Sequence, residues 1–326
     1  MEAGNTISAA LVTGGAGFVG SHLVEQLIDL GIETFLIDDF STGSMENLQA
    51  VSANKNLHII RGDVTSSLFS VPKAKKIDVV FHEAAIASVP ASVKNPEMVH
   101  DVNVNMTLKL MNFCVQHGIK RFVFASSAAV YGAEDGNISE SFLCRPASPY
   151  GAGKLAIEGY LHAYRASYGL EPVMLRYFNI YGPRQRPGDY SGVITIFIQN
   201  LLDGIPPTVM GDGLQTRDFV NVKDIVQANI LAMDSEKAVG QVFNVASGKS
   251  TTIIRIAEIL KEIIGRKELE CRFAPERVGD VKNGNADTKK IKSLLGYSPR
   301  VSLDDGLAEV VEHLKGSQKL APQIGD

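Results

Sequence analysis

Short apolar runs alternate with longer amphipathic segments through the first half of the chain. The runs that read as strands span residues 7–12, 34–37, 57–60, 78–82, 121–125 and 172–176. The segments between them are long enough for helices, and residues 122–125 are apolar throughout, as expected for a parallel strand buried on both faces. This alternation predicts an α/β fold with a doubly wound, Rossmann-like parallel sheet.

A glycine-rich segment joins the first strand pattern to the first helix pattern. Residues 11–20 read LVTGGAGFVG, and apolar residues then recur at helical spacing up to residue 30. Gly14, Gly17 and Gly20 fit the spacing G-x-x-G-x-x-G, while Gly15, Gly17 and Gly20 fit G-x-G-x-x-G. Because glycine has no Cβ, the chain can turn tightly there and a pyrophosphate can reach the backbone amides at the positive end of the helix. The segment therefore predicts a dinucleotide site.

The second strand pattern ends at an acidic pair, which indicates the kind of dinucleotide. Asp38 lies eighteen residues beyond Gly20, where a dinucleotide-binding fold places an acid against the adenosine ribose. Asp38 and Asp39 would repel a 2′-phosphate, and no Lys or Arg precedes Lys55. This distribution of charge predicts NAD rather than NADP as the cofactor.

Polar residues also follow the third and fourth strand patterns, at the carboxyl edge where ligands of open α/β sheets bind. Asp63, within residues 62–64 (GDV), is either an adenine contact or a loop acid that caps a turn. His82 begins the segment HEAA at residues 82–85. A satisfied, half-buried histidine is the simpler interpretation of His82, so we predict no chemistry for it.

A tyrosine and a lysine four residues apart give the main catalytic signal. Ser148 and Pro149 fit the N-cap and first position of a helix, so Tyr150 and Lys154 fall on one helix face. A tyrosine with a pKa of about 10 is a poor base at neutral pH, but a neighbouring ammonium and a positive nicotinamide ring both favour its phenolate. The spacing alone is common on solvated helices. Downstream of a dinucleotide site it predicts a catalytic base.

Two serines, Ser126 and Ser127, follow the fifth strand pattern at the same sheet edge. A hydroxyl there can hydrogen-bond a substrate hydroxyl. A serine pair that ends a strand and caps its own backbone is also a common structural arrangement. Both interpretations stay open from the residues alone.

Composition narrows the range of partners. With 326 residues, 45% of them hydrophobic, the chain can form a large core and a second, smaller unit. A net charge of −4 and a pI near 6.0 give no broad attraction to nucleic acid or to anionic membranes. No apolar run reaches the ~18 residues of a membrane span, and no signal peptide is recognised, so a cytoplasmic location is expected. The three cysteines, Cys114, Cys144 and Cys271, show no zinc or redox spacing and predict no metal site.

These motifs together resemble the extended short-chain dehydrogenase/reductase family, specifically its nucleotide-sugar epimerases and dehydratases. The resemblance spans nearly the whole chain. Its motifs are the glycine turn, Asp38, Asp63, Asn103, the set Ser127/Tyr150/Lys154, and residues 176–184, 211–220 and 277–287. It implies NAD as cofactor and a smaller C-terminal α/β domain for the sugar nucleotide. We expect residues 1–180 to form the NAD-binding domain, with residues from about 215 to 245 returning to it, and residues 181–326 to bind mainly the UDP-sugar.

The resemblance, with the patterns above, assigns individual site residues. Ser127, Tyr150 and Lys154 are the predicted catalytic residues. The residues predicted to bind NAD are Gly14, Gly17, Phe18, Val19, Gly20, Asp38, Asp39, Ser41, Thr42, Gly43, Asp63, Val64, Ala84, Ala85, Asn103, Tyr150, Lys154 and Tyr177. Those predicted to bind the UDP-sugar are Ser127, Tyr150, Asn179, Val193, Arg217, Arg277, Asp280 and Gly284. Among these, Asn179, Arg217 and Arg277 would hold the nucleoside diphosphate by similarity, and a guanidinium suits phosphate through forked hydrogen bonds.

Two alanines bear on the choice of reaction. The family's dehydratases carry an Asp-Glu pair directly after the Ser or Thr, and the related decarboxylases keep the Glu. Here the two positions are Ala128 and Ala129, which can act neither as acid nor as base. The resemblance then implies a UDP-hexose 4-epimerase that works through a 4-keto intermediate. The alternatives are another nucleotide-sugar oxidoreductase, a UDP-glucuronate 4-epimerase or, remotely, a non-catalytic NAD-binding sensor.

Two finer expectations also come from the resemblance. At the position of Gly284, a tyrosine accompanies restriction to unsubstituted hexoses, and a small residue accompanies acceptance of N-acetylhexosamines. Gly284 therefore predicts that UDP-GlcNAc and UDP-GalNAc are accepted, unless it only serves a loop turn and another residue closes the pocket. The second expectation is a homodimer formed by two helices of each subunit, residues 96–117 and 149–168.

Overall fold

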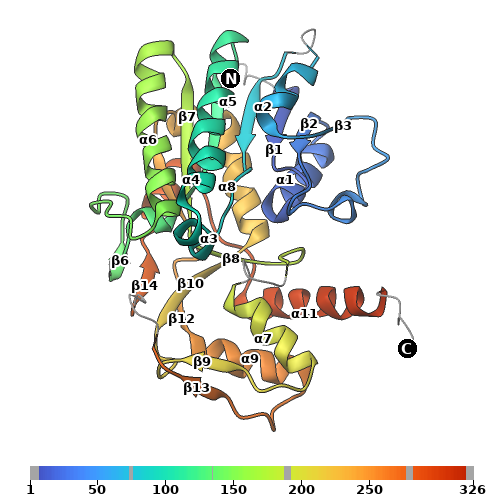
Figure 1. The fold of residues 1–326 in the computed structure, drawn as a ribbon, viewed down its shortest axis with the longest axis vertical. Coiled ribbons are helices and arrows are strands. Elements are labelled where there is room, and N and C mark those ends of the chain that lie inside the picture. Colours follow the sequence, from blue (N-terminus) through green and yellow to red (C-terminus); the bar gives the residue numbers. More distant parts are fainter. Residues whose placement is uncertain (1–6, 73–75, 134, 187–191, 277–281, 321–326) are drawn as a thin grey trace.

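A seven-stranded parallel sheet forms the centre of the larger part of the molecule. The computed structural model describes residues 7–72, 76–133, 135–186, 192–276 and 282–320. The strand order is β11-β7-β5-β4-β1-β2-β3, and all neighbouring pairs are parallel (Figure 1). Its strands are β1 (Ala9–Thr13), β2 (Glu33–Asp38), β3 (Leu57–Arg61), β4 (Val79–His82), β5 (Arg121–Ser127), β7 (Glu171–Tyr177) and β11 (Val242–Val245). The predicted doubly wound α/β fold is confirmed.

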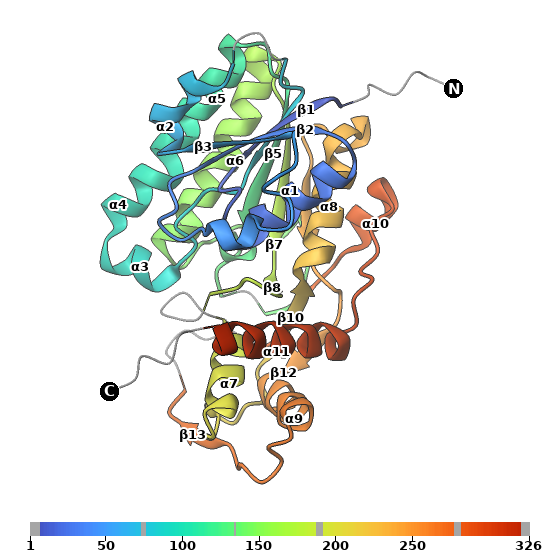
Figure 2. The ribbon, with the colours of Figure 1, turned by 90° about the vertical axis from the view of Figure 1, so that its right-hand side faces the viewer.

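Helices cover both faces of this sheet (Figure 2). One face packs against α1 (Phe18–Asp29), α8 (Val222–Asp234) and α10 (Lys289–Leu295). The other packs against α2 (Val64–Ser67), α5 (Met106–Gln116) and α6 (Pro149–Tyr168). Strand β1 shows why both faces are apolar, because Ala10 and Val12 enter the first core while Ala9 and Leu11 enter the second.

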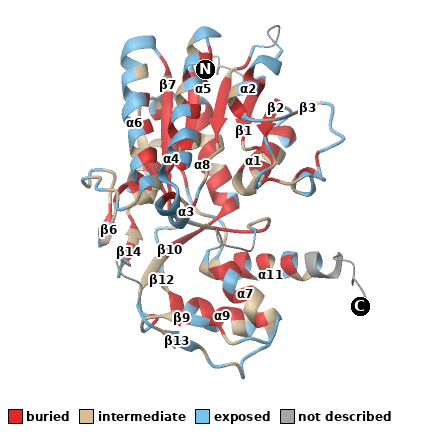
Figure 3. Ribbon diagram, viewed as in Figure 1, coloured by how far each residue is buried: buried red, intermediate tan, exposed pale blue. Residues whose placement is uncertain are grey.

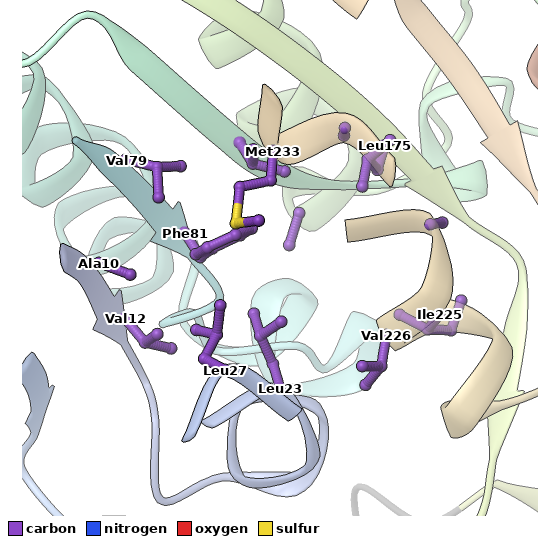
Figure 4. Packing of buried hydrophobic residues seen from close by; sticks show 14 of the residues in the cluster. Ala10, Val12, Leu23, Leu27, Val79, Phe81, Leu175, Ile225, Val226 and Met233 are labelled. Carbon is purple, nitrogen blue, oxygen red and sulfur yellow. The ribbon is translucent and has the colours of Figure 1, made fainter. Parts of the chain in front are cut away.

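The core between the sheet and helices α1 and α8 contains side chains from several strands. Figure 4 shows Leu23 and Leu27 of α1 packed near Val12 and Phe81 of the sheet. The strands of the sheet are buried, and the outer faces of the helices are exposed (Figure 3). The sheet is therefore a rigid base whose carboxyl edge can hold polar groups in fixed positions.

Short elements also occur between the strands and the longer helices, several of them at the carboxyl edge of the sheet. They are η1 (Met45–Leu48), η2 (Leu68–Ser70), α3 (Val89–Lys94), α4 (Pro96–His100), the π-helical turn η3 (Asp101–Asn105), η4 (Ala128–Val130) and η5 (Glu236–Ala238). Of these, η5 lies at the opposite edge, where Glu236 pairs with Arg121 at the start of β5. Two further short strands, β6 (Gly136–Ile138) and β14 (Gly284–Ala286), pair in parallel beside the carboxyl edge.

The smaller part of the molecule lies beyond that edge, at the bottom of Figure 1. It contains the sheet β12-β10-β8 and the pair β13-β9. Their bounds are β8 (Asn179–Tyr181), β9 (Thr208–Met210), β10 (Thr216–Asn221), β12 (Ser250–Thr252) and β13 (Arg272–Ala274). Helices α7 (Val193–Leu202), α9 (Ile253–Ile264) and α11 (Leu303–Leu320) share one hydrophobic core with these strands.

The chain passes between the two parts more than once. After β10, helix α8 and strand β11 lie on the large sheet, and after β12 to β13 the chain returns to it at α10. The predicted boundary at residue 180 stays a prediction. Within the described ranges, every helix is too short or too polar to cross a membrane.

Candidate active site

The glycine turn lies between β1 and α1, and its backbone lies close to other segments of the main chain. Gly14 has a φ of 70°, and a Cβ there would lie 2.7 Å from the amide nitrogen of Ala84. A Cβ on Gly20 would overlap the carbonyl of Gly14. Helix α1 begins at Phe18 without a side-chain cap from Gly17 and without an acid in its first turn. Its positive end is therefore suited to a pyrophosphate, so the residues present fit a dinucleotide.

Asp38, at the end of β2, fixes this turn against the next loop. Its Oδ2 accepts a hydrogen bond from the amide of Ala16 at 2.8 Å, and its Oδ1 accepts one from the amide of Phe40 at 2.8 Å. Burial raises the pKa of Asp38, and these two bonds lower it. A Cβ on Gly43 would lie 2.8 Å from Asp38 Oδ1, so the loop that carries Gly43 closes tightly over the carboxylate.

The rest of this loop presents exposed polar groups. Asp39 is exposed, and its Oδ1 accepts hydrogen bonds from the amide and the hydroxyl of Ser41 at 2.9 and 2.7 Å. Thr42 is exposed beside them. The parallel register also places Arg61 opposite Asp38, with its guanidinium 4.6 Å from the centre of the Phe40 ring. The sequence argument for NAD considered only residues before Lys55 and missed this cation.

Two further predicted cofactor residues have structural bonds of their own. Asp63 is the N-cap of α2, where its Oδ1 accepts from the amides of Thr65 and Ser66 at 2.9 and 3.2 Å. Asn103 exchanges two hydrogen bonds with the backbone of Ile86, at 2.8 and 3.1 Å. Asn103 thus holds the loop after β4 that carries Ala84 and Ala85. Contact of these residues, and of Val64 beside Asp63, with NAD stays a prediction.

His82 is a fully buried member of a hydrogen-bond chain. Its Nδ1 lies 2.7 Å from Thr13 Oγ1, and its Nε2 lies 2.7 Å from Thr107 Oγ1. Thr107 donates its own proton to the carbonyl of Asn103 at 2.7 Å, so it accepts from Nε2–H, and His82 Nδ1 accepts from Thr13. Burial lowers the pKa of His82 to about 3. His82 is thus a neutral histidine that joins β1 to α5, and its lack of a chemical role stays a prediction.

Tyr150, Lys154 and Ser127 come together where α6 meets the end of β5. Ser148 caps α6 through a 3.2 Å bond to the amide of Gly151, so the predicted helix start is confirmed. Lys154 is 3% exposed and donates to the carbonyl of Ala125 at 2.6 Å, with its Nζ 5.9 Å from the centre of the Tyr150 ring. The Ser127 hydroxyl hydrogen-bonds Tyr150.

In the structure, the pKa of Tyr150 shifts in the opposite direction to the one that the sequence predicts. Burial raises the pKa of Tyr150, a hydrogen bond from Ser127 lowers it, and Glu83 raises it. Burial also lowers the pKa of Lys154 to about 8. In the protein alone, burial therefore outweighs the effects that favour the phenolate. The positive nicotinamide ring is the further charge that the sequence argument invoked.

Glu83 is a site residue that the sequence analysis passed over. Its Oε1 accepts a 2.8 Å hydrogen bond from the hydroxyl of Tyr177, which in turn accepts from Asn229 Nδ2 at 2.7 Å. Burial raises the pKa of Glu83 to about 7, while Tyr177 and Lys154 lower it. The available signal was an acidic residue directly after a buried strand, within the segment HEAA.

The predicted substrate residues lie across the carboxyl edge, in the smaller part. Asn179 is exposed at the start of β8, and its Nδ2 donates to the carbonyl of Asp218 at 3.1 Å. Arg217, on the neighbouring β10, donates to the carbonyl of Thr216 at 2.7 Å. Val193 is the first residue of α7. Arg277 and Asp280 lie outside the described residues.

Gly284 lies in β14, next to Arg217. It is buried, its φ is outside the left-handed region, and it pairs with Gly136 of β6. A Cβ there would lie 3.4 Å from the Thr216 carbonyl oxygen and 3.7 Å from Arg217 Cδ, which are ordinary contacts. No turn at this position requires a glycine.

The two serines that follow the strand pattern of β5 have different partners. Ser126 is buried and donates to Glu158 Oε1 at 2.6 Å, whereas Ser127 bonds Tyr150 and also accepts from the amide of Ala129 at 3.1 Å. Ser126 is therefore structural, while Ser127 caps the backbone and also bonds Tyr150, and its contact with a substrate hydroxyl stays a prediction.

Glu158 and Arg176 form a buried ion pair one helical turn beyond Lys154. Arg176 donates from Nε to Oε1 at 2.9 Å and from Nη2 to Oε2 at 2.6 Å. We expect Glu158→Gln to destabilise the protein by about 3 kcal/mol, because it leaves a buried guanidinium uncompensated. Denaturant unfolding measures this. Glu258→Gln, in the exposed pair with Arg255, is the control and should change stability by less than about 0.5 kcal/mol. Equal effects of the two substitutions would contradict the prediction.

Comparison with known proteins agrees with this arrangement. Residues 10–246 match the model of the NAD dependent epimerase/dehydratase family. The UDP-glucose 4-epimerase of Mycolicibacterium smegmatis is 36% identical over 312 residues, which cover 95% of this chain and 99% of that protein.

Solved structures share the fold as well. The UDP-N-acetylglucosamine 4-epimerase of Methanobrevibacter ruminantium M1, in complex with UDP-N-acetylmuramic acid, matches with a TM-score of 0.90 and 40% identity over 95% of this chain and 99% of that one. A mutant UDP-glucuronic acid 4-epimerase of Bacillus cereus, with NAD and a fluorinated UDP-glucuronic acid, matches with a TM-score of 0.88 and 34% identity over 95% of this chain and 99% of that one. The glycine turn, the cluster at the end of β5 and these matches lead to one conclusion: the chain belongs to the NAD-dependent epimerase/dehydratase family.

Proposed function

We propose that the protein is a UDP-hexose 4-epimerase. The observation that carries this proposal is the meeting of Ser127, Tyr150 and Lys154 at the carboxyl edge, beside a turn that suits a dinucleotide. The family supplies NAD as the cofactor. Relatives named as UDP-glucose and UDP-N-acetylglucosamine 4-epimerases, which align over nearly their whole length, support UDP-sugars as the substrate class.

Each side chain of this cluster has one task in the proposed reaction. Bound NAD supplies reversible oxidation at the sugar C4 carbon. Tyr150 takes the proton of the 4-hydroxyl and returns it to the opposite epimer, while Ser127 hydrogen-bonds the same oxygen. Lys154 places a positive charge beside Tyr150 and is fixed there by the carbonyl of Ala125. The sugar must present either face of its 4-keto form to the cofactor, because inversion at C4 requires it.

Ala128 and Ala129 favour epimerisation over loss of water or carbon dioxide. Both lie in η4, directly after Ser127, and carry only methyl groups toward their surroundings. Dehydration needs an acid and a base that move protons at C5 and C6, and alanine can supply neither. Among the described residues, Glu83 is the acid that acts on Tyr150, and Tyr177 already donates to it.

The N-acetylated sugars are part of the proposal. Gly284 has no side chain that could extend toward Thr216 and Arg217, and the strand geometry does not itself require a glycine. A pocket wall without a side chain can admit an acetamide at C2. UDP-GlcNAc and UDP-GalNAc are therefore proposed substrates alongside UDP-Glc and UDP-Gal.

One assay tests the proposed function against its alternatives. The purified protein is incubated with UDP-Glc, UDP-GlcNAc or UDP-glucuronate, without added cofactor, and the products are separated. Epimers that form without net change in NADH support the proposal, and the pair that reacts fastest identifies the sugar. Net oxidation or reduction of the cofactor would support another oxidoreductase. An inert protein would support the NAD-binding sensor.

A homodimer is proposed from the helices α4 to α6. Met98 of α4 is 42% exposed and Tyr160 of α6 is 44% exposed, so each helix presents a large apolar side chain to the outside. Tyr164 of α6 donates to Asn112 of α5 at 2.7 Å, which holds the two helices side by side as one surface. We expect a dimer at micromolar concentration in sedimentation experiments. A monomer there would contradict it.

A further inference from the structure

Three successive residues at the end of β5 each hydrogen-bond a residue of α6. The bonds join Ala125 to Lys154, Ser126 to Glu158 and Ser127 to Tyr150. Because positions 150, 154 and 158 are about one turn apart on the same face of α6, the three bonds form one row along the end of the strand. The proposed reaction uses the residues of the first and the third bond. The second bond, from the Ser126 hydroxyl to Glu158 Oε1 at 2.6 Å, has no part in it.

This second bond is buried and is attached to a third element. Ser126 and Glu158 are both buried, and the parallel register places Ser126 of β5 beside Arg176 of β7. Arg176 donates to both carboxylate oxygens of Glu158, at 2.9 and 2.6 Å. Glu158 therefore joins helix α6 to two neighbouring strands at one point. We call Ser126, Glu158 and Arg176 the buried network.

The turn that follows Ser127 is in contact with both the buried network and α6. The Arg176 guanidinium lies 4.7 Å from the centre of the Tyr131 ring, directly after η4, and the Tyr131 hydroxyl donates to Asn244 at 2.6 Å. On the helix side, a Cβ on Gly151 would overlap the carbonyl oxygen of Ala129. Helix and turn therefore meet backbone to backbone beside Tyr150, so a small displacement of α6 would change the position of Tyr150 relative to Ser127.

We propose that Ser126 and Glu158 are positioning residues, which fix α6 along β5 so that the Tyr150 hydroxyl lies at Ser127. The inference rests on the proposed function, because only proton transfer by Tyr150 gives this alignment a consequence for the rate. Apolar packing of α6 on the sheet is not directional, whereas forked hydrogen bonds between a carboxylate and a guanidinium have a defined geometry. The buried network supplies the directional contact that packing alone lacks.

Ser126→Ala tests this, because it removes one hydroxyl and leaves Glu158 paired with Arg176. We expect kcat to fall by about tenfold, since a misplacement of about 1 Å costs up to a hundredfold, while KM for the UDP-hexose and the content of bound NAD stay unchanged. Thr34→Val is the matched control. It removes another buried hydroxyl of the same sheet, which donates to the carbonyl of Ile32 at 3.0 Å at the start of β2, and it should keep the full kcat. An unchanged kcat in Ser126→Ala, or an equal fall in both variants, would overturn the proposal.

A double-mutant cycle separates positioning from a general loss of active protein. Tyr150→Phe lacks the hydroxyl that the buried network is proposed to align. Adding Ser126→Ala to Tyr150→Phe should therefore leave the small residual rate unchanged, because the two substitutions act on one step. A further tenfold loss in the double variant would show that Ser126 acts independently of Tyr150, and that result would contradict the proposal.

A second measurement does not depend on turnover. In protein labelled with ¹³C at the tyrosine Cζ, the resonance that is absent from Tyr150→Phe reports the environment of that hydroxyl. It should move in Ser126→Ala and keep its position in Thr34→Val. An unmoved resonance in Ser126→Ala would remove the role of the buried network whatever the activity. The two proposals fail separately: an unmodified protein that is inert toward UDP-hexoses removes the epimerase function, whereas an active protein with independent losses in the cycle removes only the role of Ser126 and Glu158.

Discussion

Replacing Tyr150 by phenylalanine should lower epimerase turnover by about a thousandfold, within the range that a positioned acid–base group contributes. That loss corresponds to about 4 kcal/mol of transition-state stabilisation. Phenylalanine keeps the ring beside Lys154 and removes only the hydroxyl that Ser127 binds. Initial rates with a UDP-hexose, compared between variant and unmodified protein, give the result directly.

The same variant should retain its cofactor. The glycine turn, Asp38 and the start of α1 hold the predicted dinucleotide site, and none of the hydrogen bonds described for them involves Tyr150. Chromatography of nucleotides released from the denatured protein measures bound NAD. Tyr168→Phe, at the exposed end of the same helix, is the control and should keep full turnover. Near-normal turnover in Tyr150→Phe would remove this residue from the role of catalytic base.

The positions of the sheet strands could be predicted because they are set by local patterns. A parallel strand covered on both faces requires a continuous apolar run, and β5 and β7 show such runs plainly. The helix that carries Tyr150 could be predicted for a similar reason, since its cap and its first proline lie within three residues. Apolar runs and capping residues of this kind can be recognised without knowledge of the rest of the fold.

Contacts between distant strands could not be predicted in the same way. Glu83 and Tyr177 are 94 positions apart, and only the order β4-β5-β7 brings them together. Arg61 became a neighbour of Asp38 through the parallel register of β2 and β3, although nothing in the spacing indicated it. The short strands β6 and β14 contain three residues each, too few for any periodicity to be recognised.

The proposed acceptance of N-acetylated sugars depends on such a short strand. Because Gly284 belongs to β14 and has no left-handed φ, its small size is not needed for a turn. Gly284 therefore does not serve a loop turn, and its place in the wall of a sugar pocket stays a prediction. A Cβ introduced there would lie in ordinary contact distance of Thr216 and Arg217.

Gly284→Tyr should consequently abolish epimerisation of UDP-GlcNAc and UDP-GalNAc while UDP-Glc and UDP-Gal still react. We expect the ratio of kcat/KM between the two pairs to change by about a hundredfold or more, since steric exclusion acts on the acetamide alone. Gly284→Ala is the matched control, because its Cβ meets only ordinary contacts and should spare both pairs. Arg217 makes the test sharper, because its Cδ would lie 3.7 Å from the new Cβ. If tyrosine disturbs a diphosphate contact of Arg217 and not the sugar wall, both pairs will weaken together, and that result would contradict the assignment of Gly284 to the C2 pocket.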